Sequence, residues 1–109
     1  MESLTSKKCV PCEGGVQPLE HKRIVEYHHH VADWQVVADR KIRRQFSFPD
    51  FATGLDFVNR VGALAEEEGH HPDILLSWGR VEVGLTTHAI DGLSENDFIL
   101  AAKIDQLAA

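Results

Sequence analysis

The sequence has few of the features that mark membrane, secreted or nucleic-acid-binding proteins. No apolar run approaches the roughly 20 residues that a membrane-spanning helix needs, and residues 1–19 lack the apolar core of a secretory signal. We therefore expect a cytoplasmic protein that does not contact membranes. Its 11 basic residues are outnumbered by 17 acidic ones, which gives a net charge of −6. This charge argues against a nucleic-acid partner, because binding to phosphates needs a basic surface.

Cysteine is also scarce, with Cys9 and Cys12 as the two examples in 109 residues. They form a CxxC pair inside residues 1–17, a segment without apolar periodicity that we interpret as an irregular N-terminal arm. Such a pair can be half of a zinc site or a redox pair. The chain has no second CxxC and no thioredoxin-like pattern around the first, so the context favours a structural or incidental role.

The remaining residues, 18–109, have the length and the apolar content of one domain with its own core. Apolar spacing predicts alternating helices and strands, and Ser94 and Asp97 form a capping box before the last helix. The predicted elements are a helix over 19–30, strands over 34–38 and 41–48, a helix over 49–68, strands over 73–78 and 81–88 with a hairpin at 79–80, and a helix ending near 108. The order α-β-β-α-β-β-α predicts an α+β fold, with a four-stranded antiparallel sheet and helices packed on one face.

The long helix predicted over 49–68 carries two apolar stripes, which is more than one sheet should cover. The first stripe comprises Phe51, Leu55, Val58, Gly62 and Ala65, and the second comprises Phe57, Val61 and Leu64. The simpler interpretation is a deeply buried helix. The alternative is that one stripe packs on another subunit, and we expect a homodimer or homotetramer.

The stretch from Glu66 to Pro72 has the strongest chemical character in the chain. Gly69 suits the left-handed end of a helix, and Pro72 restricts the backbone of the residue before it. The histidines His70 and His71 should therefore stand on a stiff corner, and His88 follows at the end of a predicted strand. Histidine can donate or accept a proton near neutral pH. Two alternatives remain, a solvated helix end and a three-histidine zinc site.

The spacing of these residues resembles the signature of the pterin-4a-carbinolamine dehydratases. The shared pattern runs Glu66, His70-His71-Pro72, Trp78, His88 and Asp97, and it is accompanied by Trp34 and by the segments 45–48, 85–88, 92–94 and 101–105. The arm that contains the CxxC pair also resembles that of bacterial and plant members. One departure is Gly69, where some members carry an acidic residue beside the histidines.

The resemblance implies the loss of water from a 4a-hydroxytetrahydropterin, which gives a quinonoid dihydropterin in tetrahydrobiopterin recycling. It implies no metal and no organic cofactor. We assign His70 and His88 as the acid/base pair and His71 as mainly substrate-binding. The further substrate-binding candidates are Glu66, Trp34, Pro72 and Asp97, although Asp97 is also accounted for as a helix cap. The alternative function implied by the family is a non-enzymatic one, as a protein-binding or dimerisation cofactor.

Overall fold

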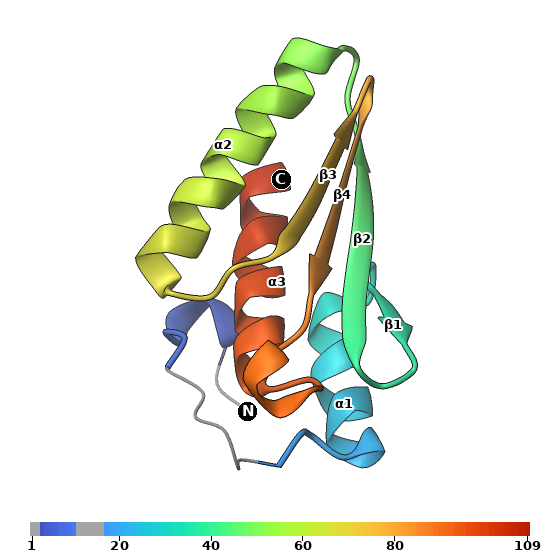
Figure 1. Cartoon of the computed structure of the whole chain (residues 1–109), viewed down its shortest axis with the longest axis vertical. Helices are drawn as coiled ribbons and strands as arrows, with labels where there is room; N and C mark the ends of the chain where they lie inside the picture. The colour runs from blue at the N-terminus through green and yellow to red at the C-terminus, as the bar shows by residue number, and fades with distance from the viewer. Residues whose placement is uncertain (1–2, 11–16) are drawn as a thin grey trace.

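The computed structural model describes residues 3–10 and 17–109, and its elements follow the predicted order (Figure 1). The helices are α1 (His21–His28), α2 (Phe51–Glu68) and α3 (Glu95–Ala108), and the strands are β1 (Gln35–Val37), β2 (Lys41–Ser47), β3 (Asp73–Ser77) and β4 (Arg80–Leu85). Three short 3-10 turns, η1 (Leu4–Ser6), η2 (His29–Val31) and η3 (His88–Ile90), complete the described elements. None of the helices in the described part of the chain is both long and apolar enough to cross a membrane.

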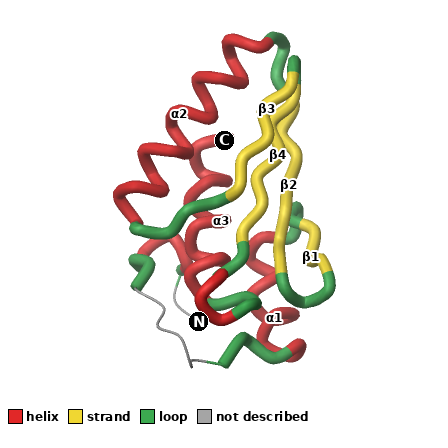
Figure 2. The backbone as a smooth tube through the Cα atoms, in the orientation of Figure 1, coloured by secondary structure: helices red, strands yellow, loops and turns green. Residues whose placement is uncertain are grey.

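The four strands form one antiparallel sheet in the order β1-β2-β4-β3. Helices α2 and α3 lie on the same side of the sheet (Figure 2). On β2, Ile42 and Phe46 are buried beneath the helices, whereas Gln45 and Ser47 point to the open face. This alternation is what a strand with one buried face requires. The predicted α+β fold class is confirmed.

The core lies between the sheet and the helices, and large aromatic side chains fill it. Trp34, Phe57 and Phe98 are fully buried, and Phe57 lies with its ring centroid 4.8 Å from that of Phe46. Burial of a large apolar side chain stabilises a fold by about 1.5–3 kcal/mol, so these aromatic residues fix how the helices sit on the sheet. The arm contributes Leu4 to the same core.

The structure shows which of the two apolar stripes of α2 faces outward, a choice that the sequence left open. Phe57 and Val61, on the second stripe, are completely buried against the sheet. Phe51 and Leu55, on the first stripe, are 44% and 42% exposed. The buried Ala65 lies on the face of Phe57 and Val61, at spacings of four residues, so its placement on the first stripe was wrong. A helix can present only one such face to the core, and here it is the second stripe.

Two predicted boundaries near the hairpin and the last strand also shift. Ser77 pairs with Arg80, so the turn consists of Trp78 and Gly79 rather than of residues 79–80. The positive φ of 75° at Gly79 is what makes glycine suitable there. Strand β4 ends at Leu85, so His88 does not close a strand but begins the turn η3.

Candidate active site

The three predicted histidines line one cleft of about 260 Å³. One wall is the connection between α2 and β3, and the other is the connection that leads from β4 to η3 (Figure 1). The lining residues are Gly69, His70, His71, Thr86, Thr87, His88 and Ala89. The structure therefore brings together histidines that are up to 18 positions apart in the sequence: His70 and His71 lie on the connection between α2 and β3, and His88 begins η3.

The first wall begins at the hydrogen-bonded C-terminal end of α2. Gly69 takes the left-handed conformation, with φ 66°, and its N–H donates to the carbonyl of Ala65. The backbone N–H of His70 donates to the same carbonyl at 3.3 Å. Glycine enters this conformation without a Cβ penalty, so the helix stops here and the chain turns toward β3. The predicted left-handed glycine end of the helix is confirmed.

His70 is held in the cleft by a hydrogen bond to a buried carboxylate. Its Nε2 lies 2.6 Å from Oδ1 of Asp97, a side chain with no solvent exposure. Oδ2 of the same carboxylate accepts from the Thr87 hydroxyl at 2.8 Å and from the Ser94 backbone N–H at 3.0 Å. Because a carboxylate can only accept, His70 presents a protonated Nε2 to it, and Nδ1 is left as the nitrogen that can exchange a proton with a ligand.

His88 and His71 are both exposed at the cleft. The backbone around His88 is held by a bridge in which the Thr87 N–H donates to the Gly92 carbonyl at 2.8 Å. His71 pairs through Nε2 with the carboxylate of Glu66, one turn back on α2. An exposed ring on a fixed backbone can approach a ligand without reorganising the fold.

Two of the predicted substrate-binding residues do not reach this cleft. Trp34 is 1% exposed and packs edge-on against Phe46 in the core, and its Nε1–H donates to Asp105 at 2.8 Å. A ring buried in this way cannot cover a substrate. Asp97 is also inaccessible, so it acts on His70 rather than on a ligand. Pro72 is half-buried and follows His71 directly.

Thr87 is a residue of the cleft lining that the sequence analysis did not name as a candidate. Its hydroxyl donates to Asp97 and lies 2.8 Å from the Ser94 hydroxyl. Its position directly before His88 is the one signal that could have pointed to it. Within the described residues, no three histidine, cysteine, aspartate or glutamate side chains are placed to hold a metal ion.

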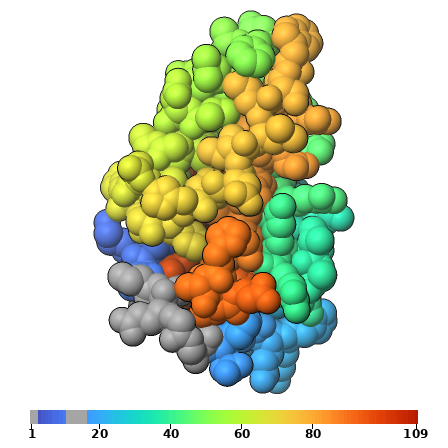
Figure 3. All heavy atoms as spheres, in the orientation of Figure 1, coloured from blue at the N-terminus to red at the C-terminus, as the bar shows by residue number. Residues whose placement is uncertain are grey.

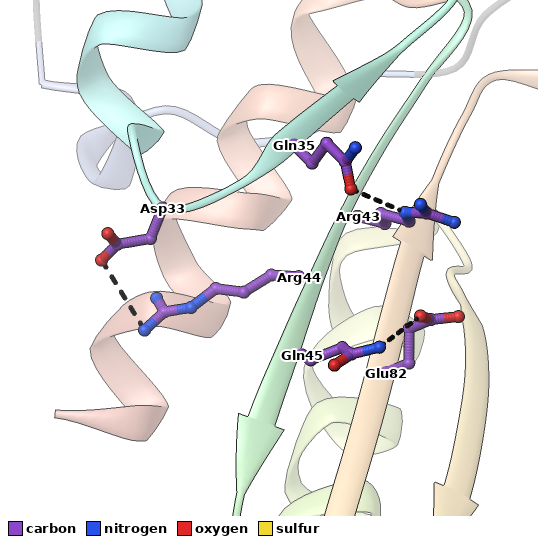
Figure 4. A pocket seen from close by; sticks show the side chains of 6 residues that line it. All are labelled: Asp33, Gln35, Arg43, Arg44, Gln45 and Glu82. Carbon is purple, nitrogen blue, oxygen red and sulfur yellow. Dashed lines mark hydrogen bonds and ion pairs between the residues drawn. The ribbon is translucent and has the colours of Figure 1, made fainter.

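A second hollow, lined by residues at or next to strands β1, β2 and β4, has a different character (Figure 4). It measures about 370 Å³ and is lined by Asp33, Gln35, Arg43, Arg44, Gln45 and Glu82. Its side chains pair with one another: Arg43 donates to Gln35 at 3.0 Å, and Gln45 donates to Glu82 at 3.1 Å. With its polar groups already paired and no histidine in the lining, this hollow is a weaker candidate than the cleft.

Known proteins resemble this chain in sequence and in fold. Residues 17–107 match the family described as Pterin 4 alpha carbinolamine dehydratase. A protein of Rubrobacter xylanophilus assigned as a pterin-4-alpha-carbinolamine dehydratase is 51% identical over 98% of this chain and all of its own length. A transcriptional coactivator/pterin dehydratase from Brucella melitensis has a similar structure, with TM-score 0.79 and 33% identity over 85% of this chain and all of that one.

A more distant structure is a pterin dehydratase-like protein identified as a RuBisCO assembly factor in the alpha-carboxysome. Its TM-score is 0.62 and its identity 28%, over 74% of this chain and 95% of that one. The family match spans most of the chain and includes every residue of the histidine cleft. This chain therefore belongs to the pterin-4-alpha-carbinolamine dehydratase family.

Proposed function

We propose that the protein removes water from a 4a-hydroxytetrahydropterin to give a quinonoid dihydropterin, as a step of tetrahydrobiopterin recycling. The reaction breaks the C4a–O bond and forms a C4a=N5 double bond. One proton is added to the departing hydroxyl and one is removed from N5, so an acid and a base are both needed. The observation that carries the proposal is the His70–Asp97 pair in a cleft that also holds His88.

His70 is suited to take the N5 proton. The buried carboxylate of Asp97 lies against Nε2 and favours the positive charge that forms when Nδ1 accepts a proton. A histidine held by an aspartate in this way also keeps one tautomer and one orientation. Asp97 is a positioning residue here, because it touches His70 and not the substrate.

His88 is suited to protonate the leaving hydroxyl. It is exposed on the opposite wall of the cleft, and the water formed can leave directly into solvent. His71 and Glu66, paired at the cleft rim, offer hydrogen-bonding groups for the polar edge of a pterin. The acid/base step uses only imidazoles, so chelation should leave turnover unchanged.

The test is a dehydratase assay on the purified protein, with the carbinolamine supplied by an aromatic amino acid hydroxylase. Loss of a general acid or base lowers the rate by about 10²-fold or more, and we expect this for both His70→Ala and His88→Ala. His71→Ala should mainly raise KM. His29→Ala, which changes an exposed histidine on η2, is the matched control and should keep wild-type turnover. Wild-type turnover in both His70→Ala and His88→Ala would refute the assignment.

A protein-binding function is the second candidate, and the outward stripe of α2 favours it. Phe51 and Leu55 are exposed large apolar residues on that helix, and neighbouring exposed apolar side chains mark interaction surfaces. We propose that this stripe joins copies of the chain into a homodimer or homotetramer. Of the two solved relatives, one is a transcriptional coactivator/pterin dehydratase and the other a pterin dehydratase-like RuBisCO assembly factor, so a different protein partner is the alternative occupant of this stripe.

A further inference from the structure

We propose that the N-terminal segment of residues 7–10, called the clamp below, is a positioning element of the active site. It binds the end of α2, which leads into His70, and the start of α3, which carries Asp97. By holding these two segments together, the clamp sets the hydrogen bond between His70 and Asp97. The proposal rests on the function proposed above, because it assigns a further set of residues to the same chemistry.

The first clamp contact is at the last residue of α2. The backbone N–H of Cys9 donates to Oε1 of Glu68 at 2.9 Å. Glu68 is buried and precedes His70 by two positions. Its other oxygen, Oε2, accepts from Lys103 of α3 at 2.8 Å. Burial raises the pKa of Glu68, but the hydrogen bonds from Lys103 and the Cys9 N–H outweigh it and hold the pKa below its usual value. Glu68 is therefore a charged link between the clamp, α2 and α3.

The second clamp contact is at the first turn of α3. The Val10 backbone N–H donates to Oδ1 of Asn96 at 3.0 Å, and the Asn96 Nδ2 donates back to the Val10 carbonyl at 2.5 Å. Asn96 is buried and directly precedes Asp97. One residue earlier, Glu95 accepts from Lys7 at 2.8 Å. Glu95 and Asn96 of α3 thus bind the clamp, and the next residue, Asp97, binds His70.

These contacts matter because the two partners come from different parts of the chain. His70 and Asp97 are 27 positions apart, and their 2.6 Å contact depends on how the end of α2 sits against the start of α3. Figure 3 shows the surface of the N-terminal segment bordering that of the end of α2. Hydrogen bonds weaken steeply when they lengthen or bend, and a displacement of about 1 Å can cost about 10²-fold in rate. A support within two residues of each partner is well placed to prevent such a displacement.

The main clamp contacts come from the backbone N–H groups of Cys9 and Val10 and from the Lys7 side chain, whereas the Cys9 thiol adds one longer contact, to the Asn96 carbonyl at 3.6 Å. Burial raises the pKa of that thiol to about 12, so it stays protonated at neutral pH and is a poor nucleophile. The clamp also lies outside residues 17–107, the part of the chain that matches the family.

The experiment compares Asn96→Ala, Glu68→Ala and Glu68→Gln in the full chain. We expect Asn96→Ala and Glu68→Ala to lower kcat about tenfold with KM within about twofold, because a misaligned pair affects the chemical step more than binding. Both changes should also shift the NMR signals of the His70 ring, because they move its hydrogen-bond partner. Glu68→Gln should stay within about threefold of wild type, since the Gln oxygen still accepts from the Cys9 N–H. Lys103 loses its charged partner in both Glu68 variants. The difference in kcat between Glu68→Ala and Glu68→Gln therefore reports the loss of the hydrogen bond from the Cys9 N–H.

Two further variants separate positioning from stability. Ile24→Val removes one buried methylene from α1 and should lower the free energy of unfolding by about 0.5–1.5 kcal/mol without changing kcat or the His70 signals. If Asn96→Ala fails to fold, Val10→Pro removes the donor to Asn96 from an exposed residue. Folded variants with wild-type kcat and unchanged His70 signals would overturn the proposal. If the wild type has no dehydratase activity, the proposed function fails, and the His70 signals still decide whether the clamp positions the pair.

Discussion

Asp97→Asn is the most informative single substitution, because it replaces one carboxylate oxygen by an NH2 group without changing the shape of the side chain. In the wild type, Oδ1 serves His70 while Oδ2 accepts from Thr87 and Ser94. Whichever way the amide turns, its NH2 meets a group that was donating. A lost hydrogen bond to a buried charged group costs about 1.5–3 kcal/mol, so we expect the free energy of unfolding to fall by about 2 kcal/mol.

The same substitution should lower kcat about 10²-fold or more, because His70 loses both its preferred tautomer and the carboxylate that stabilises its positive charge. Stopped-flow dehydratase kinetics would measure kcat, and urea denaturation would measure stability. Asp50→Asn is the matched control, since Asp50 caps α2 through the Thr53 N–H at 2.8 Å and lies outside the cleft. It should leave kcat unchanged. A folded Asp97→Asn protein with kcat within about threefold of wild type would refute the role of Asp97 in orienting His70.

Three further predictions concern assembly, the cysteines and pH. Leu55→Glu should lower the mass measured by light scattering, whereas Phe57→Glu should unfold the chain, because Leu55 is exposed and Phe57 is buried; a monomeric wild type would contradict the first. Changing Cys9 and Cys12 to Ser should leave turnover nearly unchanged, because the clamp uses the Cys9 N–H; lost turnover in a folded double variant would show that a thiol is needed. The depressed pKa of Glu68 contributes stability that is present above its ordinary value of 4.5 and is lost as pH falls through the folded value. Glu68→Gln removes the titrating carboxyl, so the free energy of unfolding measured by urea denaturation should fall less between roughly pH 5 and 3 than it does in the wild type. An equally steep fall in both proteins would contradict this prediction.

The sequence predicts much of the fold because local rules and tertiary packing agree. The capping box of α3, formed by Ser94 and Asp97, and the glycine end of α2 are both present as predicted. Alternation over β2 predicts its buried face, and Arg44 is an exception with a clear reason. Its guanidinium lies 4.5 Å over the ring of Phe46 and 2.7 Å from Asp105, so a charge on the apolar face is partnered.

The positions that could not be predicted depend on contacts between distant residues. Trp34 stands at a position that the family resemblance associates with the substrate, but Asp105 of α3 binds its indole N–H and keeps it in the core. Of the two apolar stripes on α2, periodicity alone cannot select the buried one, because both have helical spacing. CxxC spacing likewise does not reveal the contacts of Cys9 with α2, and Cys12 lies outside the described residues.

The predicted metal alternative and the acid/base interpretation differ in what they require of the surrounding structure. A metal draws its ligands together by coordination, whereas an acid/base pair needs each imidazole to be held separately on its own wall. Here His70 is held by Asp97, and the backbone at His88 is held by the Thr87–Gly92 bridge. Each wall is fixed by its own hydrogen bonds, so the space between the imidazoles can stay open for a flat ring. This is the arrangement that the proposed proton transfer at two faces of a pterin would require.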